Sequence, residues 1–323
     1  MAMLSCGQKS TGESAPAQNK VKQASTSEKA SATPAFDADS AYHYVQRQVD
    51  FGPRVPNTDA QKKCGDYLAG ELRRFGAKVY EQEAVVTAYD NTGLQIRNIV
   101  GSFDPDNKKR VLLFAHWDSR PYADHDPNPA NHRTPIDAAD DGASGVGVLL
   151  EIARQIGREM PETGVDIIFF DAEDYGTPEF VDEYKPDTWC LGTQFWTKNP
   201  HVPGYQADFG ILLDMVGGKQ ATFFKEQLST MYAAPIVELV WNTARNLGYG
   251  KYFIQAAGGA ITDDHQYVIS GRNIPCIDII NYDPDTEGGF APYWHTVNDT
   301  MENIDRETLK AVGQTVLEVV YNR

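Results

Sequence analysis

The sequence predicts an α/β fold in which a mixed, mostly parallel central sheet is flanked by helices on both faces. From residue 110 onward, short apolar runs alternate with longer segments of helical periodicity, which is the order of elements in βαβ units. The apolar runs are nearly uninterrupted, as expected of parallel strands that are buried on both faces. No segment repeats at a fixed period, so a repeat architecture is not indicated.

The predicted elements begin with an amphipathic helix at residues 59–75, where Cys64, Leu68 and Leu72 recur at helical spacing. Two segments then alternate in polarity like the strands of a hairpin or meander, at residues 78–86 and 95–100. Further strands are predicted at residues 110–115, 166–170, 209–213 and 275–280. Further helices are predicted at residues 144–160, 233–247 and 306–320.

The N-terminal segment differs in composition from the rest of the chain. Residues 7–35 are rich in Ser, Thr, Ala, Lys, Gln and Pro, and Val21 is their only large aliphatic residue. Such a segment cannot bury enough apolar surface to fold. We therefore expect residues 1–35 to be a disordered tether that is dispensable for activity, and residues 36–323 to be a single catalytic domain.

A short motif at residues 3–7, Met-Leu-Ser-Cys-Gly, resembles the end of a bacterial lipoprotein signal, with Cys6 as the acylated residue. On this interpretation the protein is extracytoplasmic, in the periplasm, and carries a lipid anchor at Cys6. The alternative is an incidental cysteine in a disordered tail.

The charge of the chain argues against one class of function. Acidic residues outnumber basic ones by 45 to 29, which gives a formal net charge of −16, and no stripe of Lys and Arg is present. Nucleic-acid binding needs such a stripe, so we expect no nucleic-acid partner. No apolar run is long enough to span a membrane. The four cysteines form no CxxC pair, and their positions do not dictate a disulfide.

Acidic residues and histidines follow the predicted strands at their carboxyl ends. In open α/β sheets, ligands bind beyond these ends, so the side chains are expected to converge at one edge. A single Asp or His there is usually a cap or turn residue, but five clusters together are not explained in this way. The clusters are His116-Trp117-Asp118-Ser119, Asp140-Asp141-Gly142, Asp171-Ala172-Glu173-Asp174, Asp214 and Trp294-His295-Thr296.

Buried carboxylates that converge would repel one another unless a cation neutralised them. Imidazole and carboxylate ligands suit zinc, so the clusters predict a zinc site. The glycine-rich residues 142–147 lack the Lys-Ser/Thr of a P-loop and are interpreted as close helix–sheet packing. No Gly-x-Ser-x-Gly motif is present. Cys190 has no local activating group and is interpreted as a structural thiol.

In this order, the clusters resemble those of the zinc aminopeptidases (peptidase family M28), and the similarity extends over roughly residues 40–323. Within that clan the chain is most similar to the glutaminyl cyclases, in a bacterial branch of the animal-like type. Two motifs carry this closer similarity, Ile261-Thr262-Asp263-Asp264-His265 and Phe290-Ala291-Pro292-Tyr293-Trp294-His295-Thr296. The aminopeptidases have only one acid before the His of the first motif and lack the Trp of the second.

The resemblance implies a zinc-dependent glutaminyl-peptide cyclotransferase, an acyltransferase that converts the N-terminal Gln of peptides and proteins into pyroglutamate and releases ammonia. It implies one zinc ion per chain, with one coordination position open to the side-chain carbonyl of the substrate. It also implies that Glu173 takes a proton from the α-amine and delivers it to the departing ammonia. The implied zinc ligands are Asp141, Asp174 and His295, the supporting carboxylates are Asp214 and Asp263, and the pocket aromatics are Phe290 and Trp294.

One residue departs from the pattern of the animal enzymes, which carry Glu at the position of Asp174. Asp is shorter by one methylene, so the strand end and the metal are expected to lie closer together, or neighbouring loops to shift. The bacterial branch resembles this chain here, so the assignment of Asp174 as a ligand is retained.

Two other functions are compatible with parts of the pattern. A dinuclear zinc aminopeptidase would use Glu173 to activate a water molecule. Its two ligand sets would be His116, Asp141 and Asp214 for one ion, and Asp141, Asp174 and His295 for the other. A non-catalytic binding protein would keep the fold alone, but the intact Glu173 and the full ligand set argue against it. Asp263, Trp294 and the number of zinc ions distinguish the cyclase from the aminopeptidase.

Overall fold

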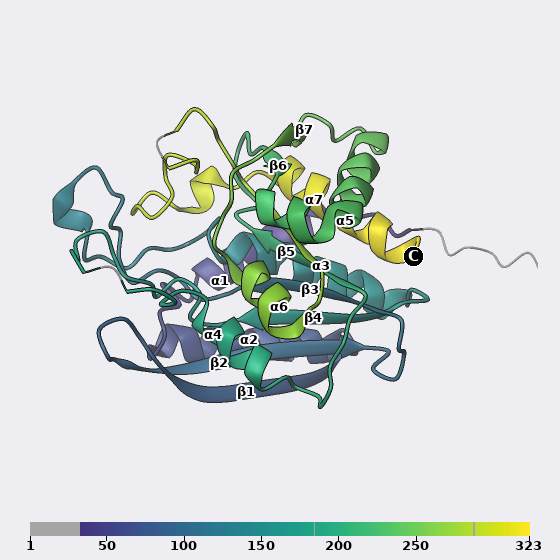
Figure 1. Ribbon diagram of the computed structural model, residues 1–323, viewed down its shortest axis with the longest axis horizontal. Coiled ribbons are helices and arrows are strands. Elements are labelled where there is room, and N and C mark those ends of the chain that lie inside the picture. The colour runs from purple at the N-terminus through teal and green to yellow at the C-terminus, as the bar shows by residue number, and fades with distance from the viewer. Residues whose placement is uncertain (1–32, 184, 287) are drawn as a thin grey trace, which may run out of the picture. The chain divides into compact units, whose positions relative to one another are not determined.

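The computed structural model describes residues 33–323 apart from residues 184 and 287, and this part of the chain contains a six-stranded sheet in the order β1-β2-β4-β3-β5-β8 (Figure 1). The pairs β3–β4, β3–β5 and β5–β8 are parallel, whereas β1–β2 and β2–β4 are antiparallel. The prediction of a mixed, mostly parallel sheet is therefore confirmed. The strands of this sheet are β1 (Lys78–Thr87), β2 (Gly93–Phe103), β3 (Arg110–His116), β4 (Gly164–Phe170), β5 (Phe209–Asp214) and β8 (Cys276–Ile280).

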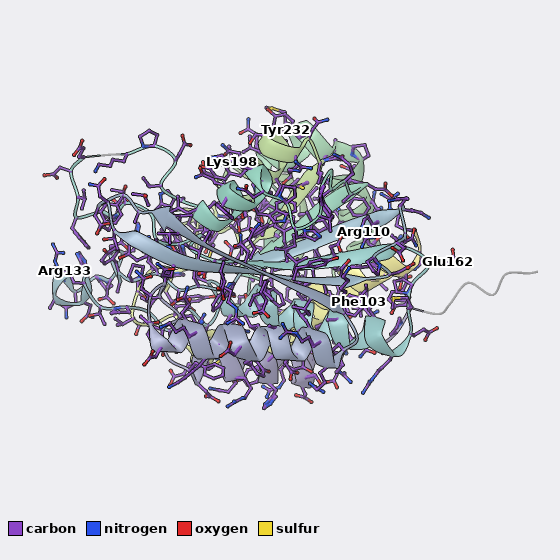
Figure 2. All side chains as sticks on the ribbon, turned by 90° about the horizontal axis from the view of Figure 1, so that it is seen from below. Phe103, Arg110, Arg133, Glu162, Lys198 and Tyr232 are labelled. Atoms are coloured by element: carbon purple, nitrogen blue, oxygen red, sulfur yellow. The ribbon has the colours of Figure 1, made fainter. Side chains whose placement is uncertain are left out.

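Helices cover both faces of the sheet, as Figures 1 and 2 show. Alternate residues of β3 point to opposite sides: Leu113 belongs to the larger apolar core, and Leu112 belongs to the smaller one. The larger core is completed by α1 (Ala38–Val49), α2 (Asp59–Arg74), α3 (Ala143–Arg158), α5 (Gln227–Asn246) and α7 (Arg306–Tyr321). The smaller core is completed by α4 (Leu191–Lys198) and α6 (Asp264–Arg272). Short elements are β6 (Phe223–Lys225), β7 (Phe253–Ala257), η1 (Pro129–Asn131) and η2 (Met301–Asn303).

The glycine-rich start of α3 fits tightly against the sheet. A Cβ atom on Gly145 would lie 2.1 Å from the backbone oxygen of Leu213, at the end of β5. The interpretation of these glycines as close helix–sheet packing is thus confirmed at Gly145. Gly142 has a φ of 107°, which L-residues rarely adopt, and a Cβ there would lie 2.5 Å from the backbone oxygen of Asp118. Both glycines let α3 begin directly at the carboxyl ends of the strands.

One predicted helix begins earlier than its apolar pattern indicates. The sequence predicts a helix from residue 233, whereas α5 begins at Gln227. Ala233 has non-helical angles (φ −141°, ψ 34°), two residues before Pro235, which cannot donate a backbone hydrogen bond. The turn before this kink is stabilised by Glu226, whose carboxylate accepts hydrogen bonds from the backbone of Leu228 and Ser229.

The proposed lipidation residue Cys6 and most of the predicted tether lie outside the described residues. Phe36 is buried against α7, and Gln314 on that helix donates a hydrogen bond to the backbone oxygen of Pro34, 3.1 Å away. Among residues that the structure describes, no helix is long and apolar enough to cross a membrane. The cysteines in this part, Cys64, Cys190 and Cys276, are buried free thiols.

Candidate active site

The acidic residues that follow β4 are held in place by the carboxylate of Asp118, which lies two residues beyond β3. The backbone N–H groups of Glu173 and Asp174 donate to its two oxygens, at 3.0 and 3.2 Å. Ala172, just before them, has a φ of 51°, which turns the chain sharply at the strand end. Asp118 is fully buried. Its two hydrogen bonds fix both acidic side chains at the carboxyl edge of the sheet.

The acidic pair before α3 is held in the same way by the carboxylate of Asp299. The backbone N–H groups of Asp140 and Asp141 donate to its two oxygens, at 2.9 and 3.1 Å. Asp140 in turn accepts hydrogen bonds from the Tyr293 hydroxyl and the Gly217 backbone N–H, both at 2.8 Å. The Asp141 side chain is therefore set on a rigid turn and contacts His116, at the end of β3, and His295.

Asp141, Asp174 and His295 converge as a buried group that could hold a metal ion, here called the His295 group. The imidazole Nε2 of His295 lies 3.3 Å from an oxygen of Asp141 and 3.2 Å from an oxygen of Asp174. Although Asp174 is one methylene shorter than the Glu of the animal enzymes, its carboxylate lies close enough to His295 for both to bind one metal ion. Arg120 supports it, since its guanidinium donates to the Asp174 backbone oxygen at 3.0 Å and pairs with Asp124 at 2.5 Å.

Two carboxylate oxygens of the His295 group lack a well-formed hydrogen bond. They are Oδ2 of Asp141, which lies 3.3 Å from His295 Nε2, and Oδ2 of Asp174, and both are buried. Burial raises the pKa of Asp174, although His295 partly offsets this effect. Burial also opposes ionisation of Asp141, but its contacts with His116 and His295 outweigh burial and lower its pKa. Buried polar atoms without a partner are uncommon in folded proteins, and these two oxygens are available to a cation.

His116, Asp141 and Asp214 form a second buried group, here called the His116 group, which shares Asp141 with the first. The imidazole Nε2 of His116 lies 3.0 Å from an oxygen of Asp141 and 3.2 Å from an oxygen of Asp214. Burial lowers the pKa of His116, but hydrogen bonds to the surrounding carboxylates, Asp118 first, raise it well above its ordinary value. The surrounding carboxylates therefore favour the protonated form of this imidazole.

Glu173 lies beside these groups and is buried, with 9 % of its surface exposed. Burial raises its pKa well above the ordinary value, and the neighbouring carboxylates of Asp174, Asp263 and Asp264 raise it further. The thiol of Cys190 donates to one of its oxygens at 3.2 Å. A carboxyl group with a raised pKa in a partly dry site suits proton transfer near neutral pH.

A cavity of about 190 Å³ opens onto Glu173 and the His295 group. Its walls include Phe290 and Trp294, whose rings lie 4.5 Å apart between centroids, and Trp294 stacks on His295 at 3.8 Å. Further lining residues are Trp189, Asp214, Met215, Ile261, Thr262, Asp263 and Ile280. The pocket is thus small and apolar-walled, with carboxylates at one side.

The structure brings the residues singled out in the sequence to one site. The three expected zinc ligands form one group, and Glu173, Asp263, Phe290 and Trp294 line the cavity beside it. Asp214 also lines the cavity, and its carboxylate is hydrogen-bonded to His116. Trp189, Arg120 and the contact of Cys190 with Glu173 were not predicted from the sequence. Trp189 and Cys190 lie in a loop without a recognisable motif, and only the fold places them here.

Comparisons with known proteins agree with this arrangement. Residues 98–320 match the family model described as "Peptidase family M28". The bovine glutaminyl-peptide cyclotransferase is 26% identical over 296 residues, which cover 82% of this chain and 77% of the bovine protein. The chain therefore belongs to peptidase family M28, and the resemblance inferred from the sequence is confirmed.

Within this family, the chain is similar to solved bacterial glutaminyl cyclases. The Tannerella forsythia glutaminyl cyclase is 73% identical, with a TM-score of 0.89, over 90% of this chain and 100% of that one. A protein from Parabacteroides distasonis ATCC 8503, described as a Zn-dependent exopeptidase, is 77% identical with a TM-score of 0.90 over the same shares. These two descriptions correspond to the two enzyme functions considered from the sequence.

Proposed function

We propose that this protein is a zinc-dependent glutaminyl-peptide cyclotransferase that closes the N-terminal Gln of peptides and proteins into pyroglutamate and releases ammonia. One zinc ion per chain is held by Asp141, Asp174 and His295. The observation that carries the proposal is the convergence of Asp141, Asp174 and His295 on one cavity beside Glu173. One buried oxygen on each of the two aspartates, Asp141 Oδ2 and Asp174 Oδ2, lacks a well-formed hydrogen bond there.

The His295 group fits zinc by its geometry and its chemistry. Ligand bonds of roughly 2.0 Å at tetrahedral angles separate neighbouring ligand atoms by about 3.3 Å. The separations from His295 Nε2 to the two carboxylates, 3.3 and 3.2 Å, agree with this value. One nitrogen and carboxylate oxygens are a donor set that zinc accepts. A cation also supplies a partner for Asp141 Oδ2 and Asp174 Oδ2.

The His116 group is proposed to hold a proton in place of a second metal ion. A histidine must be neutral to bind a metal. The carboxylates raise the pKa of His295, and they raise that of His116 well above the ordinary value, although burial opposes both shifts. Its Nε2 is already engaged by Asp214 and Asp141 at 3.2 and 3.0 Å. A protonated His116 places one positive charge where a dinuclear aminopeptidase would hold its second zinc ion.

The reaction then needs one proton shuttle and no nucleophile from the protein. Zinc bound at the His295 group supplies Lewis-acid polarisation of the side-chain amide carbonyl of the substrate. Glu173 accepts a proton from the substrate α-amine as its nitrogen bonds to the side-chain amide carbon. Glu173 then returns a proton to the amide nitrogen as the bond from that carbon breaks and ammonia leaves.

The remaining pocket residues support this transfer. Asp263 lies with Glu173 and Cys190 in one buried group, and its own pKa is raised to about 7 by burial and by Asp214. Such neighbours raise the proton affinity of Glu173. Phe290 and Trp294 wall the cavity and hold the glutamine side chain folded back on its amine. Ring closure is intramolecular, so holding the two reacting groups together lowers the barrier.

A dinuclear aminopeptidase is the second candidate, because the His116 group contains all the ligands for a second ion. Incubation with a Gln-initiated dipeptide and, separately, a Leu-initiated dipeptide decides between the two functions. The cyclase releases ammonia from the first and leaves the second intact. Free leucine from the second, with no ammonia from the first, would establish the aminopeptidase instead.

We further propose an extracytoplasmic, periplasmic location with a lipid anchor at Cys6, on the basis of the signal-like motif at residues 3–7. The full chain expressed in a bacterium is expected in the membrane fraction. The Cys6→Ser variant is expected in the soluble extracytoplasmic fraction. An identical distribution of both proteins would rule out the anchor.

A further inference from the structure

Cys190 contacts Glu173 through both its backbone and its side chain. Its backbone N–H donates to the Glu173 backbone oxygen at 2.9 Å, and its Sγ donates to Glu173 Oε1 at 3.2 Å. The next residue, Leu191, donates in the same way to the backbone oxygen of Ala172 at 3.0 Å. The start of α4 is thus paired with the loop after β4 that carries Glu173, and the thiol is directed at its carboxylate.

The surroundings of Cys190 keep its sulfur protonated. The side chain is fully buried. Burial raises the pKa of the thiol well above its ordinary value, and the carboxylates of Glu173, Asp264 and Asp263 add to this. A thiolate here would be both desolvated and repelled, so Cys190 serves neither as a nucleophile nor as an anionic metal ligand. What remains is a weak S–H donor that points at one carboxylate oxygen.

The backbone of Cys190 indicates that the side chain matters at this position. Its φ is 55°, in the left-handed region that glycine adopts most readily and other residues adopt at a cost. A glycine would relieve this strain but would remove the contact with Glu173. The thiol also restricts a terminal carboxylate torsion that is otherwise broad, and it leaves the second oxygen, Oε2, free of this contact.

We propose that Cys190 is a positioning residue, whose S–H group fixes the Glu173 carboxylate in the orientation required for proton transfer. This inference rests on the proposed function, because it assumes that Glu173 carries the proton. It assigns to Cys190 a part in turnover and none in zinc binding or in ground-state binding of the substrate.

Three variants of the full-length zinc enzyme test this role with a Gln-initiated dipeptide as substrate. Cys190→Ala and Cys190→Gly remove the donor, and the glycine also suits the left-handed backbone, so that this variant is expected to fold. Both should lower kcat by about 5–10-fold, the effect of losing one modest hydrogen bond in the transition state. KM should stay within about twofold, and zinc content should be unchanged. Cys190→Ser restores a donor and should recover most of kcat.

The matched control is Cys276→Ala, which removes another buried thiol, on β8 in the smaller core. Its kcat should equal that of the wild type. Unchanged kcat in Cys190→Ala and Cys190→Gly would overturn the proposal, and so would a serine variant as slow as the alanine variant. Loss of zinc in step with kcat would assign Cys190 a structural role instead. A Glu173→Gln variant with normal turnover would refute the proposed function itself. Failure of the Cys190 proposal can therefore be distinguished from failure of the proposed function.

Discussion

At the amino ends of β3 and β4, Arg110 and Asp166 form a buried ion pair at 2.7 Å, and Asp166 also accepts hydrogen bonds from Tyr205 and Ser102 at 2.8 and 2.5 Å. At the carboxyl ends of the same strands, carboxylates outnumber cationic groups, and one oxygen each of Asp141 and Asp174 lacks a well-formed hydrogen bond. Figure 2 shows Arg110 in the right half of the molecule and Arg133, in the loop that follows β3, at the left-hand end.

The difference between the two ends indicates that the amino end mainly stabilises the fold and the carboxyl end mainly serves the reaction. A buried charge that is fully paired is tolerated as part of the core, whereas an unpaired one is costly. The amino end therefore contributes to folding, and the carboxyl end keeps a deficit of positive charge that a metal ion and a transferred proton can fill. Substitutions at the carboxyl end should reduce activity more than stability, and those at the amino end should do the opposite.

The largest loss of activity is expected for Asp174→Ala, which removes a proposed zinc ligand. Zinc content and cyclisation should fall together, by more than the roughly 10–100-fold loss of metal affinity that follows removal of an outer partner of a ligand. Metal analysis and ammonia release measure the two quantities. Asp182→Ala, at an exposed residue of the same loop, serves as the control and should keep both. A zinc-loaded, active Asp174→Ala enzyme would show that zinc is held elsewhere.

Glu173→Gln should reduce turnover by about 10²–10⁴-fold, the usual contribution of general acid–base catalysis, while zinc stays bound. Gln matches Glu in size, and it replaces a buried acid whose pKa burial has raised, so the melting temperature should not fall. The exposed Glu179→Gln is the matched control, with turnover expected at the wild-type level. Near-normal cyclisation by Glu173→Gln would mean that another group moves the proton.

At the amino end, Arg110→Met leaves Asp166 without its cation. Breaking a buried pair costs about 3–5 kcal/mol of unfolding free energy, which corresponds to a decrease of roughly 10 °C in melting temperature. The kcat at 25 °C should be unchanged, because the pair lies at the end of the strands opposite to the cavity. Lys109→Met, at the exposed neighbour, should change neither quantity. A loss of kcat without a loss of stability would contradict the division between the two ends.

A smaller effect is expected from His201, which accepts a hydrogen bond from Trp196 at 3.2 Å near the same end. Burial lowers its pKa to about 4, below the ordinary 6.5. The unfolded chain therefore binds a proton before the folded protein does. The contribution of this neutral histidine to stability is complete above about pH 6.5 and is lost as the pH falls towards about 4.

Between pH 7 and pH 5 this loss amounts to roughly 1–2 kcal/mol. His201→Gln should therefore lose less stability than the wild type over that interval, as measured by urea unfolding. His43→Gln, at an exposed histidine of α1, should follow the wild type. The same acid sensitivity in His201→Gln and the wild type would show that His201 is not responsible.

The fold could be predicted from the sequence where burial leaves a strong pattern. The strand predicted at residues 110–115 differs from β3 by one residue. A central parallel strand is buried on both faces, so its residues form a continuous apolar run that is easily recognised. By contrast, α6 is short, and only Asp264, His265 and Val268 on it are buried, so it has no apolar stripe to recognise. The kink at Ala233 likewise concealed the first turn of α5.

The sequence predicted which residues form the site, but it did not predict which of their side chains contact one another. The clusters predicted a zinc site, and the resemblance to the zinc aminopeptidases and glutaminyl cyclases implied both sets of metal ligands. Nothing in the sequence indicates that Asp141 gives one oxygen to each histidine, or that Asp214 pairs with His116, because these contacts depend on how distant loops pack. Cys190 was interpreted as a structural thiol, and only the fold brings its sulfur to Glu173.

The number of zinc ions in the active protein tests whether the His295 group alone holds zinc. Metal analysis of the purified chain, combined with cyclisation of a Gln-initiated dipeptide by the same sample, gives both quantities at once. We predict one zinc ion per fully active chain, with no gain in rate on addition of more zinc. Two tightly held zinc ions per active chain would contradict it, since the second ion would have to displace the proton from His116.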